Sequence, residues 1–169
     1  NNSAVILDRL NKGVINALGQ TGKREEIQDD GMDMTLLVID KKAKKMNLAL
    51  ANHNVFFFRG NEFTSIEGDI FSIGGVLSKS IEVKFTNHEY KIENGDVIYM
   101  FSDGFQDQFG GELGKKYMAT RFKNFINQIH NHPMQIQEHK VKNEFKSWQG
   151  HEKQVDDILV IGIKFNDLE

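Results

Sequence analysis

The chain contains no cysteine, and this absence removes several kinds of chemistry at once. Disulfides, thiolate-bound zinc and a cysteine nucleophile are all excluded. Proline is almost absent too, since Pro133 is the only one. No apolar run approaches the ~20 residues that a membrane-spanning helix requires. We therefore expect no membrane contact by this segment, and the lack of cysteine suits a reducing, cytoplasmic location.

An excess of positive charge is also missing. Lysine and arginine together number 21 against 24 aspartates and glutamates, which gives a net charge of −3. Proteins that bind nucleic acids usually carry a broad basic surface to neutralise phosphates, so we expect no nucleic-acid partner. The length of 169 residues fits one domain, 1–169. The first residues form neither a signal peptide nor a methionine start, and we expect a segment of a longer protein.

The beginning of the chain has the spacing of an amphipathic helix. Its apolar residues recur every three or four positions: Ile6, Leu7, Leu10, Val14 and Leu18. Ser3 is the predicted cap, and Gly19 and Gly22 are predicted to end the helix. The charged residues 23–30 then predict a solvated loop.

From residue 34 onward the pattern changes to short strands. The predicted strands are 34–40, 46–52, 55–59, 62–66, 81–85, 88–92 and 96–102. Helical spacing returns over 117–129, Pro133 opens a helix that runs to about residue 148, and the apolar run 158–165 predicts a central strand. Because short turns can join only antiparallel neighbours, the sequence predicts an α+β fold with helices packed on antiparallel sheets.

One motif with candidate chemistry is Ser102-Asp103-Gly104, which comes directly after a predicted strand. A carboxylate held at the end of a strand is a suitable ligand for a hard cation. The alternative is a simple turn in which Asp103 caps exposed amides. Taken alone, so short a motif favours the alternative.

A second motif is Asp156-Asp157, immediately before the last apolar strand. Adjacent carboxylates repel each other, and a nearby cation would offset that repulsion. The alternative is a solvated start of the strand. A third acidic segment, 30–33, lacks the alternating acids and distal glutamate of a calcium-binding loop, and we interpret it as a turn.

Together these segments resemble the SpoIIE-like branch of the PPM (protein phosphatase 2C-like) superfamily. The resemblance rests on DGMDMTLLVID, a hairpin, the turn Ile73–Gly75, NGDVIYMFSDGFQDQFGG and QVDDILVIGIKF, in that order. It covers nearly the whole chain. It implies two antiparallel β-sheets flanked by helices, an α/β/β/α sandwich whose N-terminal strands are missing here.

The resemblance also implies an activity: hydrolysis of phosphoserine and phosphothreonine in proteins, by water activated at two Mn²⁺ or Mg²⁺ ions. Asp103 and Asp156 match the metal ligands of the family, with Asp157 and Asp107 as weaker candidates, and we expect the Asp103 and Asp156 carboxylates to approach each other. No further catalytic residue and no organic cofactor is implied. The alternative is a non-enzymatic module that binds a phosphoprotein.

Partners and context follow from the same resemblance. Substrates would be phosphorylated proteins of the anti-sigma-factor antagonist type in a bacterial signalling pathway. An upstream sensor or repeat module could anchor the full-length protein at a membrane, and an unpaired sheet edge could support a homodimer.

The sequence departs from the family pattern in two places. Asn52 replaces a glycine after the second strand, and the family's first motif, with its metal-bridging aspartate, does not occur, so we expect the isolated chain to be inactive.

Overall fold

The computed structural model describes residues 2–20, 30–75 and 83–168. These residues form four helices and eleven strands, and every pairing recorded between two strands is antiparallel. The chain divides into two compact units. Unit 1 comprises residues 1–55, 65–94 and 167–169, and unit 2 comprises residues 56–64 and 95–166. The predicted loop at 23–30 lies outside the described residues except for its last residue.

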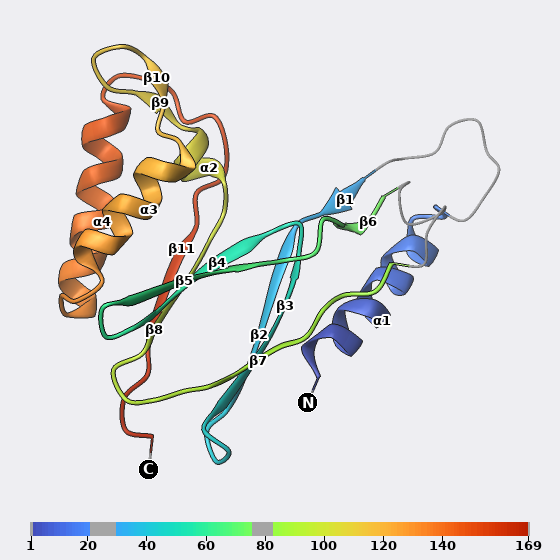
Figure 1. Ribbon diagram of the computed structural model, residues 1–169. Coiled ribbons are helices and arrows are strands. Elements are labelled where there is room, and N and C mark those ends of the chain that lie inside the picture. The colour runs from blue at the N-terminus through green and yellow to red at the C-terminus, as the bar shows by residue number, and fades with distance from the viewer. Residues whose placement is uncertain (1, 21–29, 76–82, 169) are drawn as a thin grey trace. The chain divides into compact units, whose positions relative to one another are not determined.

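Unit 1 combines a helix with a three-stranded sheet. Its elements are α1 (Ser3–Ala17), β1 (Gly31–Met32), β2 (Met34–Asp40), β3 (Lys45–Ala51), β6 (Ile73–Gly74) and β7 (His88–Lys91) (Figure 1). The strands pair in the order β2-β3-β7, while β1 pairs with β6. The predicted hairpin is confirmed, with Asp40 opposite Lys45 at its turn. Helix α1 packs on β3, and Leu7 is completely buried there.

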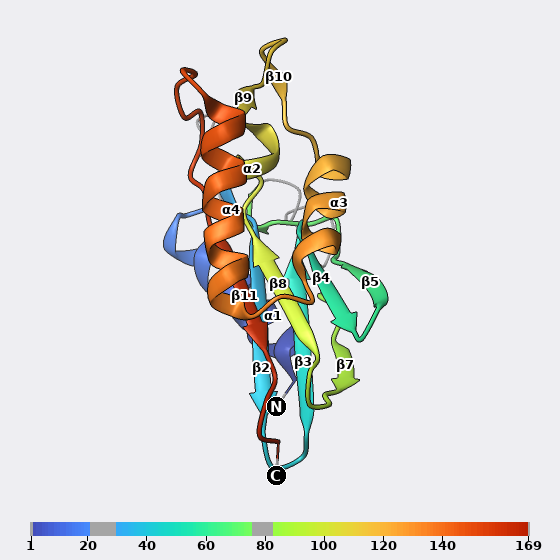
Figure 2. The ribbon, with the colours of Figure 1, turned by 90° about the vertical axis from the view of Figure 1, so that its left-hand side faces the viewer.

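Unit 2 contains a larger sheet with helices on one face. Its elements are β8 (Val97–Phe101), α2 (Gly104–Asp107), β9 (Phe109–Gly110), β10 (Lys115–Lys116), α3 (Ala119–Ile129), α4 (Met134–Gln149) and β11 (Val160–Lys164). The sheet order is β11-β8-β4-β5, where β4 (Asn54–Arg59) and β5 (Glu62–Glu67) each extend into unit 1. Figure 2 looks onto the face that α3 and α4 cover.

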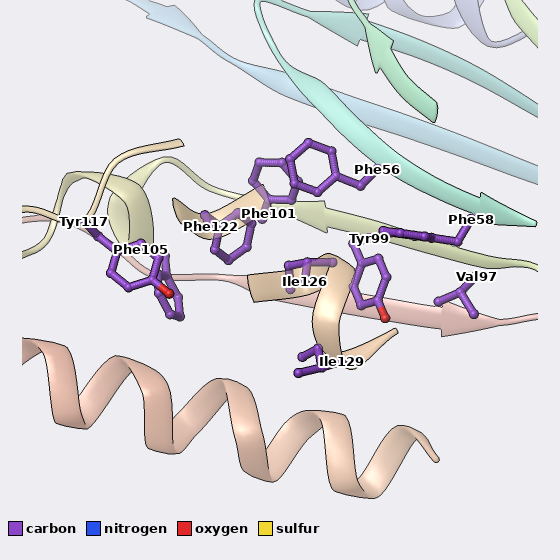
Figure 3. Packing of buried hydrophobic residues seen from close by; sticks show 10 residues of the cluster. All are labelled: Phe56, Phe58, Val97, Tyr99, Phe101, Phe105, Tyr117, Phe122, Ile126 and Ile129. Carbon is purple, nitrogen blue, oxygen red and sulfur yellow. The ribbon is translucent and has the colours of Figure 1, made fainter. Parts of the chain in front are cut away.

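Aromatic rings form the core of unit 2 (Figure 3). Phe101 on β8 lies 4.8 Å from Phe122 on α3, and Phe122 lies 5.0 Å from Phe105 on α2, measured between ring centroids. Phe105 in turn lies 5.0 Å from Tyr117. Contacts of this kind stabilise the core beyond the area they bury. Because Phe105 is 1% exposed, it fixes α2, which begins directly after Asp103.

Several expectations from the sequence were wrong. Asn2, not Ser3, caps α1 by accepting a hydrogen bond from the Val5 amide, whereas the Ser3 hydroxyl donates to the Asn47 carbonyl. Of the predicted strand 81–85, residues 83–85 are not in a strand, and residues 81 and 82 lie outside the described residues. Strand β11, expected to be central, lies at an edge and pairs only with β8 among the described strands. The residues of β11 are apolar because helix α4 covers the strand, not because strands lie on both sides of it.

Three further findings concern the helices. Helix α2 was not predicted, because four residues cannot show a helical period. Helix α4 begins where expected, with Pro133 at the N-cap. Among the helices that the structure describes, none has the length and apolarity to span a membrane.

Candidate metal centre

The two acidic motifs lie side by side at one end of the sheet in unit 2, where β8 ends and β11 begins. Strands β8 and β11 are antiparallel with Phe101 opposite Val160. The last residue of β8 and the first residue of β11 therefore lie at the same end of the sheet. The ladder continues for one more pair, since the Ser102 amide donates to the Leu159 carbonyl at 2.9 Å. Asp103 follows the first strand directly, and Asp156 and Asp157 precede the second.

Gly104 brings the two motifs into direct contact. A Cβ atom placed on Gly104 would lie only 2.3 Å from the Asp157 carbonyl oxygen, much closer than a side chain tolerates. Gly104 has helical backbone geometry within α2, so its role is to permit this close approach.

Ser102 links the same two segments through its side chain. Its hydroxyl donates to the Asp157 carbonyl at 2.7 Å and accepts from the Leu159 amide at 2.9 Å. Together with the backbone pair, Ser102 makes three hydrogen bonds across this edge. The segment after β8 and the segment before β11 are therefore held in one arrangement.

The candidate carboxylates differ in their surroundings. Asp103 is exposed and is the N-cap residue of α2, but its side chain makes no capping hydrogen bond. The capping alternative for Asp103 therefore does not hold. Asp157 is also exposed, and neither its carboxylate nor that of Asp103 has a hydrogen-bond or ion-pair partner among the described residues. Asp156 is exposed, and its Oδ1 accepts from the Asp157 amide at 2.6 Å.

Asp107 is engaged elsewhere. Its Oδ2 lies 3.0 Å from Lys116 Nζ on β10, so a cation would have to replace this ammonium group. Within 2–20, 30–75 and 83–168, no group of three or more histidine, aspartate, glutamate or cysteine side chains is arranged to hold a metal ion. Asp103 and Asp157 supply free, exposed oxygen ligands of the kind that Mg²⁺ and Mn²⁺ prefer. This donor set fits part of such a site.

Unit 1 explains the departure at Asn52. This residue has φ of +48°, a conformation that glycine adopts freely and that asparagine tolerates best among the other residues. Its side-chain amide donates to Asp33 at 3.0 Å, and Asp33 also accepts from the Ser72 hydroxyl. Asn52 and Asp33 thus stabilise the same turn, and Asp33 is not part of a calcium-binding loop.

Residues that the sequence interpretation missed also shape this edge. Gln108 is completely buried in unit 2, and Trp148 donates from its indole nitrogen to the Gln108 carbonyl at 2.9 Å. A Cβ atom on Gly110 would lie 1.9 Å from the Trp148 carbonyl oxygen, which explains the glycine at this position. The only signal in the sequence was the polar, glycine-rich run that follows Asp103.

Comparisons with known proteins define the class. The sequence profile of the Stage II sporulation protein E (SpoIIE) family matches residues 2–166. The chain belongs to this family. Its fold is that of the PP2C-type phosphatase domains, as the solved structures show. No curated protein sequence matches the chain significantly.

Three solved structures illustrate the likeness. The PP2C domain of SiaA from Pseudomonas aeruginosa is 24% identical with a TM-score of 0.83, and the match covers 98% of this chain and 61% of that domain. The phosphatase domain of SpoIIE from Bacillus subtilis is 14% identical with a TM-score of 0.57, covering 99% and 75%. The catalytic domain of the serine/threonine phosphatase PstP, in complex with two manganese ions, is 14% identical with a TM-score of 0.61, covering 99% and 73%. This chain thus spans about three-fifths of the SiaA domain.

Proposed function

We propose that the whole protein hydrolyses phosphoserine and phosphothreonine in proteins with the help of divalent cations, as the output of a signalling pathway. The observation that carries this proposal is the contact between Gly104 and Asp157, because it joins the two acidic motifs at one sheet edge. Asp103 and Asp156 are the proposed ligands, with Asp157 and Asp107 as further candidates. The manganese ions of the PstP structure support Mn²⁺ as the ion, with Mg²⁺ as the alternative.

Each residue has a distinct task in this proposal. Asp103 and Asp157 offer carboxylates that no described residue engages, so binding a cation requires no bond to be broken. When bound, such ions withdraw electrons from a phosphate ester and make water a nucleophile near neutral pH. Ser102 and Gly104 hold the backbones of the two acidic segments together, which reduces the reorganisation needed during binding.

We further propose that residues 1–169 alone are inactive and that an additional aspartate from the longer protein completes the site. The described residues offer too few convergent ligands for two ions, and the match spans 61% of the SiaA domain. Without a further carboxylate, the acids at this edge would repel each other instead of holding two cations.

The decisive experiment measures p-nitrophenyl phosphate hydrolysis with Mn²⁺. It compares this chain, a chain extended upstream, and the extended chain with Asp103→Asn. We expect turnover only in the extended chain, and a loss of more than ~100-fold in Asp103→Asn, since even outer-sphere changes cost roughly 10–100-fold at metal sites. Glu152→Gln is the matched control because Glu152 is an exposed acid in the segment before Asp156 and is not a proposed ligand. Full activity in Asp103→Asn would remove that residue from the site.

A second candidate function is a phosphoprotein-binding module without turnover. The lack of a three-ligand group among the described residues favours it. An extended chain that binds a phosphorylated anti-sigma-factor antagonist but hydrolyses nothing would support this candidate. Turnover by the extended chain would exclude it.

We also propose that strand β11 accepts another strand, from an upstream segment or from a second copy in a homodimer. Leu159 and Ile161 are 56% and 38% exposed, and an apolar groove of about 650 Å³ runs between α4 and β11. An unpaired edge of this kind promotes pairing. Light scattering of this chain and of the extended chain distinguishes the two sources, because only the shorter chain would dimerise if the upstream segment fills the edge. An upstream sensor module and a cytoplasmic location complete the proposal.

A further inference from the structure

The segment that carries Asp156 and Asp157 has little structure of its own. Residues 150–159 lie between α4 and β11 and form neither helix nor strand, and 150–157 are all exposed. In Figure 1 this part of the chain descends beside β9 and α2. A loop of this kind holds two carboxylates in place only if other residues fasten it. Ser102 fastens its C-terminal end through Asp157 and Leu159.

Gln108 fastens the N-terminal part. Its side-chain nitrogen donates to the carbonyl of Lys153 at 2.9 Å and to the carbonyl of Phe109, also at 2.9 Å. The Lys153 contact joins residues 45 positions apart in the sequence. Lys153 stands three residues before Asp156, so both ends of the acidic segment are tied to the chain around α2.

Gln108 is itself held rigidly. Its side chain has no exposed area, and its backbone carbonyl accepts from the Trp148 indole at 2.9 Å and from the Tyr117 amide at 3.0 Å. A buried residue with four hydrogen bonds, two through its side chain and two through its carbonyl, has very little freedom. The loop is therefore held in place by a residue that is itself fixed in the core.

The side-chain oxygen of Gln108 indicates that this residue does more than stabilise the fold. Its Oε1 is buried and has no hydrogen-bond partner in the described part of the chain. A buried acceptor without a partner costs free energy. An apolar side chain of the same length would avoid that cost, but it could not hold the Lys153 carbonyl.

We propose that Gln108 is a positioning residue that fixes the loop of Asp156 and Asp157 for cation binding. The proposal rests on the proposed function, in which these carboxylates hold Mn²⁺ or Mg²⁺. Gln108 touches neither substrate nor ion, and it acts only through the Lys153 carbonyl. Removing its amide would free the loop and weaken cation binding while the fold remains.

The test compares two buried glutamines in the extended chain. Gln108→Met removes both donated hydrogen bonds and keeps the length of the side chain. Gln137→Met is the matched control, because Gln137 is 2% exposed and its Nε2 also donates to two carbonyls, those of His130 and His132. Gln137→Met loses two donated hydrogen bonds, as Gln108→Met does, and also the bond that Gln137 Oε1 accepts from the Tyr99 hydroxyl. It is therefore at least as disruptive to the core, but only Gln108 contacts the acidic loop.

Two readouts are measured: Mn²⁺ affinity by calorimetry and hydrogen–deuterium exchange of residues 153–157. We expect Gln108→Met to weaken Mn²⁺ binding roughly 10–100-fold and to speed exchange in the loop, while Gln137→Met changes neither. Unchanged affinity in folded Gln108→Met, or equal weakening in Gln137→Met, would overturn the proposal. If Gln108→Met does not fold, Gln108→Asn, which keeps an amide but is one methylene shorter, has the same expected and contrary outcomes.

Failure of the proposed function gives a different result. Wild-type protein that binds no Mn²⁺ would refute both the metal centre and the role of Gln108 in it. Wild-type protein that binds Mn²⁺ with an affinity that does not depend on Gln108 would refute only the positioning role. Faster exchange without any change in affinity would show that the loop is fastened by Gln108 but does not need to be rigid to bind the ion.

Discussion

Substituting Gly104 by alanine tests the contact that joins the two acidic motifs. The new Cβ would lie 2.3 Å from the Asp157 carbonyl oxygen and 3.2 Å from Ile158 Cγ1. Ordinary contact begins near 3.4 Å, so α2 or the acidic loop must move by about 1 Å. Both are fixed, α2 by the buried ring of Phe105 and the loop by Ser102. Forcing extra volume into such a site costs typically about 1–3 kcal/mol.

The expected loss of about 2 kcal/mol lowers the folded-to-unfolded ratio about 30-fold. With a urea dependence of about 2 kcal/mol per molar, the midpoint of unfolding falls by about 1 M. Trp148, the only tryptophan, reports unfolding of unit 2 by fluorescence, and circular dichroism reports the whole chain. Gly13→Ala is the control, because nothing lies within 4 Å of its Cβ position in α1, and it should stabilise the chain by roughly 0.5–1 kcal/mol. A Gly104→Ala midpoint equal to that of the wild type would refute the proposed contact.

Two further predictions concern buried polar groups of unit 2. Burial raises the pKa of Tyr99 well above its ordinary value of 10.0, so the folded state resists ionisation and stability falls as the pH rises above about 10. Tyr99→Phe should therefore show a shallower decline in the free energy of unfolding between pH 9 and pH 11 than the wild type, and an equal slope would contradict this. Arg59 donates to both carboxylate oxygens of Asp96, at 3.0 and 2.7 Å, and Asp96 is 2% exposed. Arg59→Met should destabilise by roughly 1–3 kcal/mol because it removes two charge-assisted hydrogen bonds from a buried carboxylate. A loss below about 0.5 kcal/mol in urea unfolding would argue against the importance of the pair.

The elements that could be predicted from the sequence are those with local causes. The β2–β3 hairpin follows from two apolar runs around a basic turn, and α4 begins at Pro133 because proline suits the start of a helix. The fold class followed from the order of these elements. The edge position of β11 did not follow, because an apolar strand looks the same whether strands or a helix cover it.

The candidate site was only partly predictable for the same reason. Asp103 and Asp156 were proposed as ligands from short motifs, but the sequence could not show that Gly104 lets the two motifs come into contact at the Asp157 backbone. Gln108 was missed because a glutamine in a polar run is usually exposed. Asp96 was predicted only as the first residue of a strand, although its buried pair with Arg59 joins β4 to the start of β8.

The geometry of the candidate centre is decided by residues that lie within the sheet. Tyr99 on β8 pairs with Gly162 on β11, and a Cβ atom on Gly162 would lie 3.3 Å from the Tyr99 ring and 2.8 Å from Met134 Cε. A larger residue there would collide with both, and a slip of one residue would turn every side chain of β11 to the other face. Continued past the end of the ladder, the same register places Gly104 opposite Asp157, where the structure has them in contact. Tyr99 facing Gly162 thus helps to set the register that brings Gly104 of one acidic motif against the Asp157 backbone of the other, several residues away.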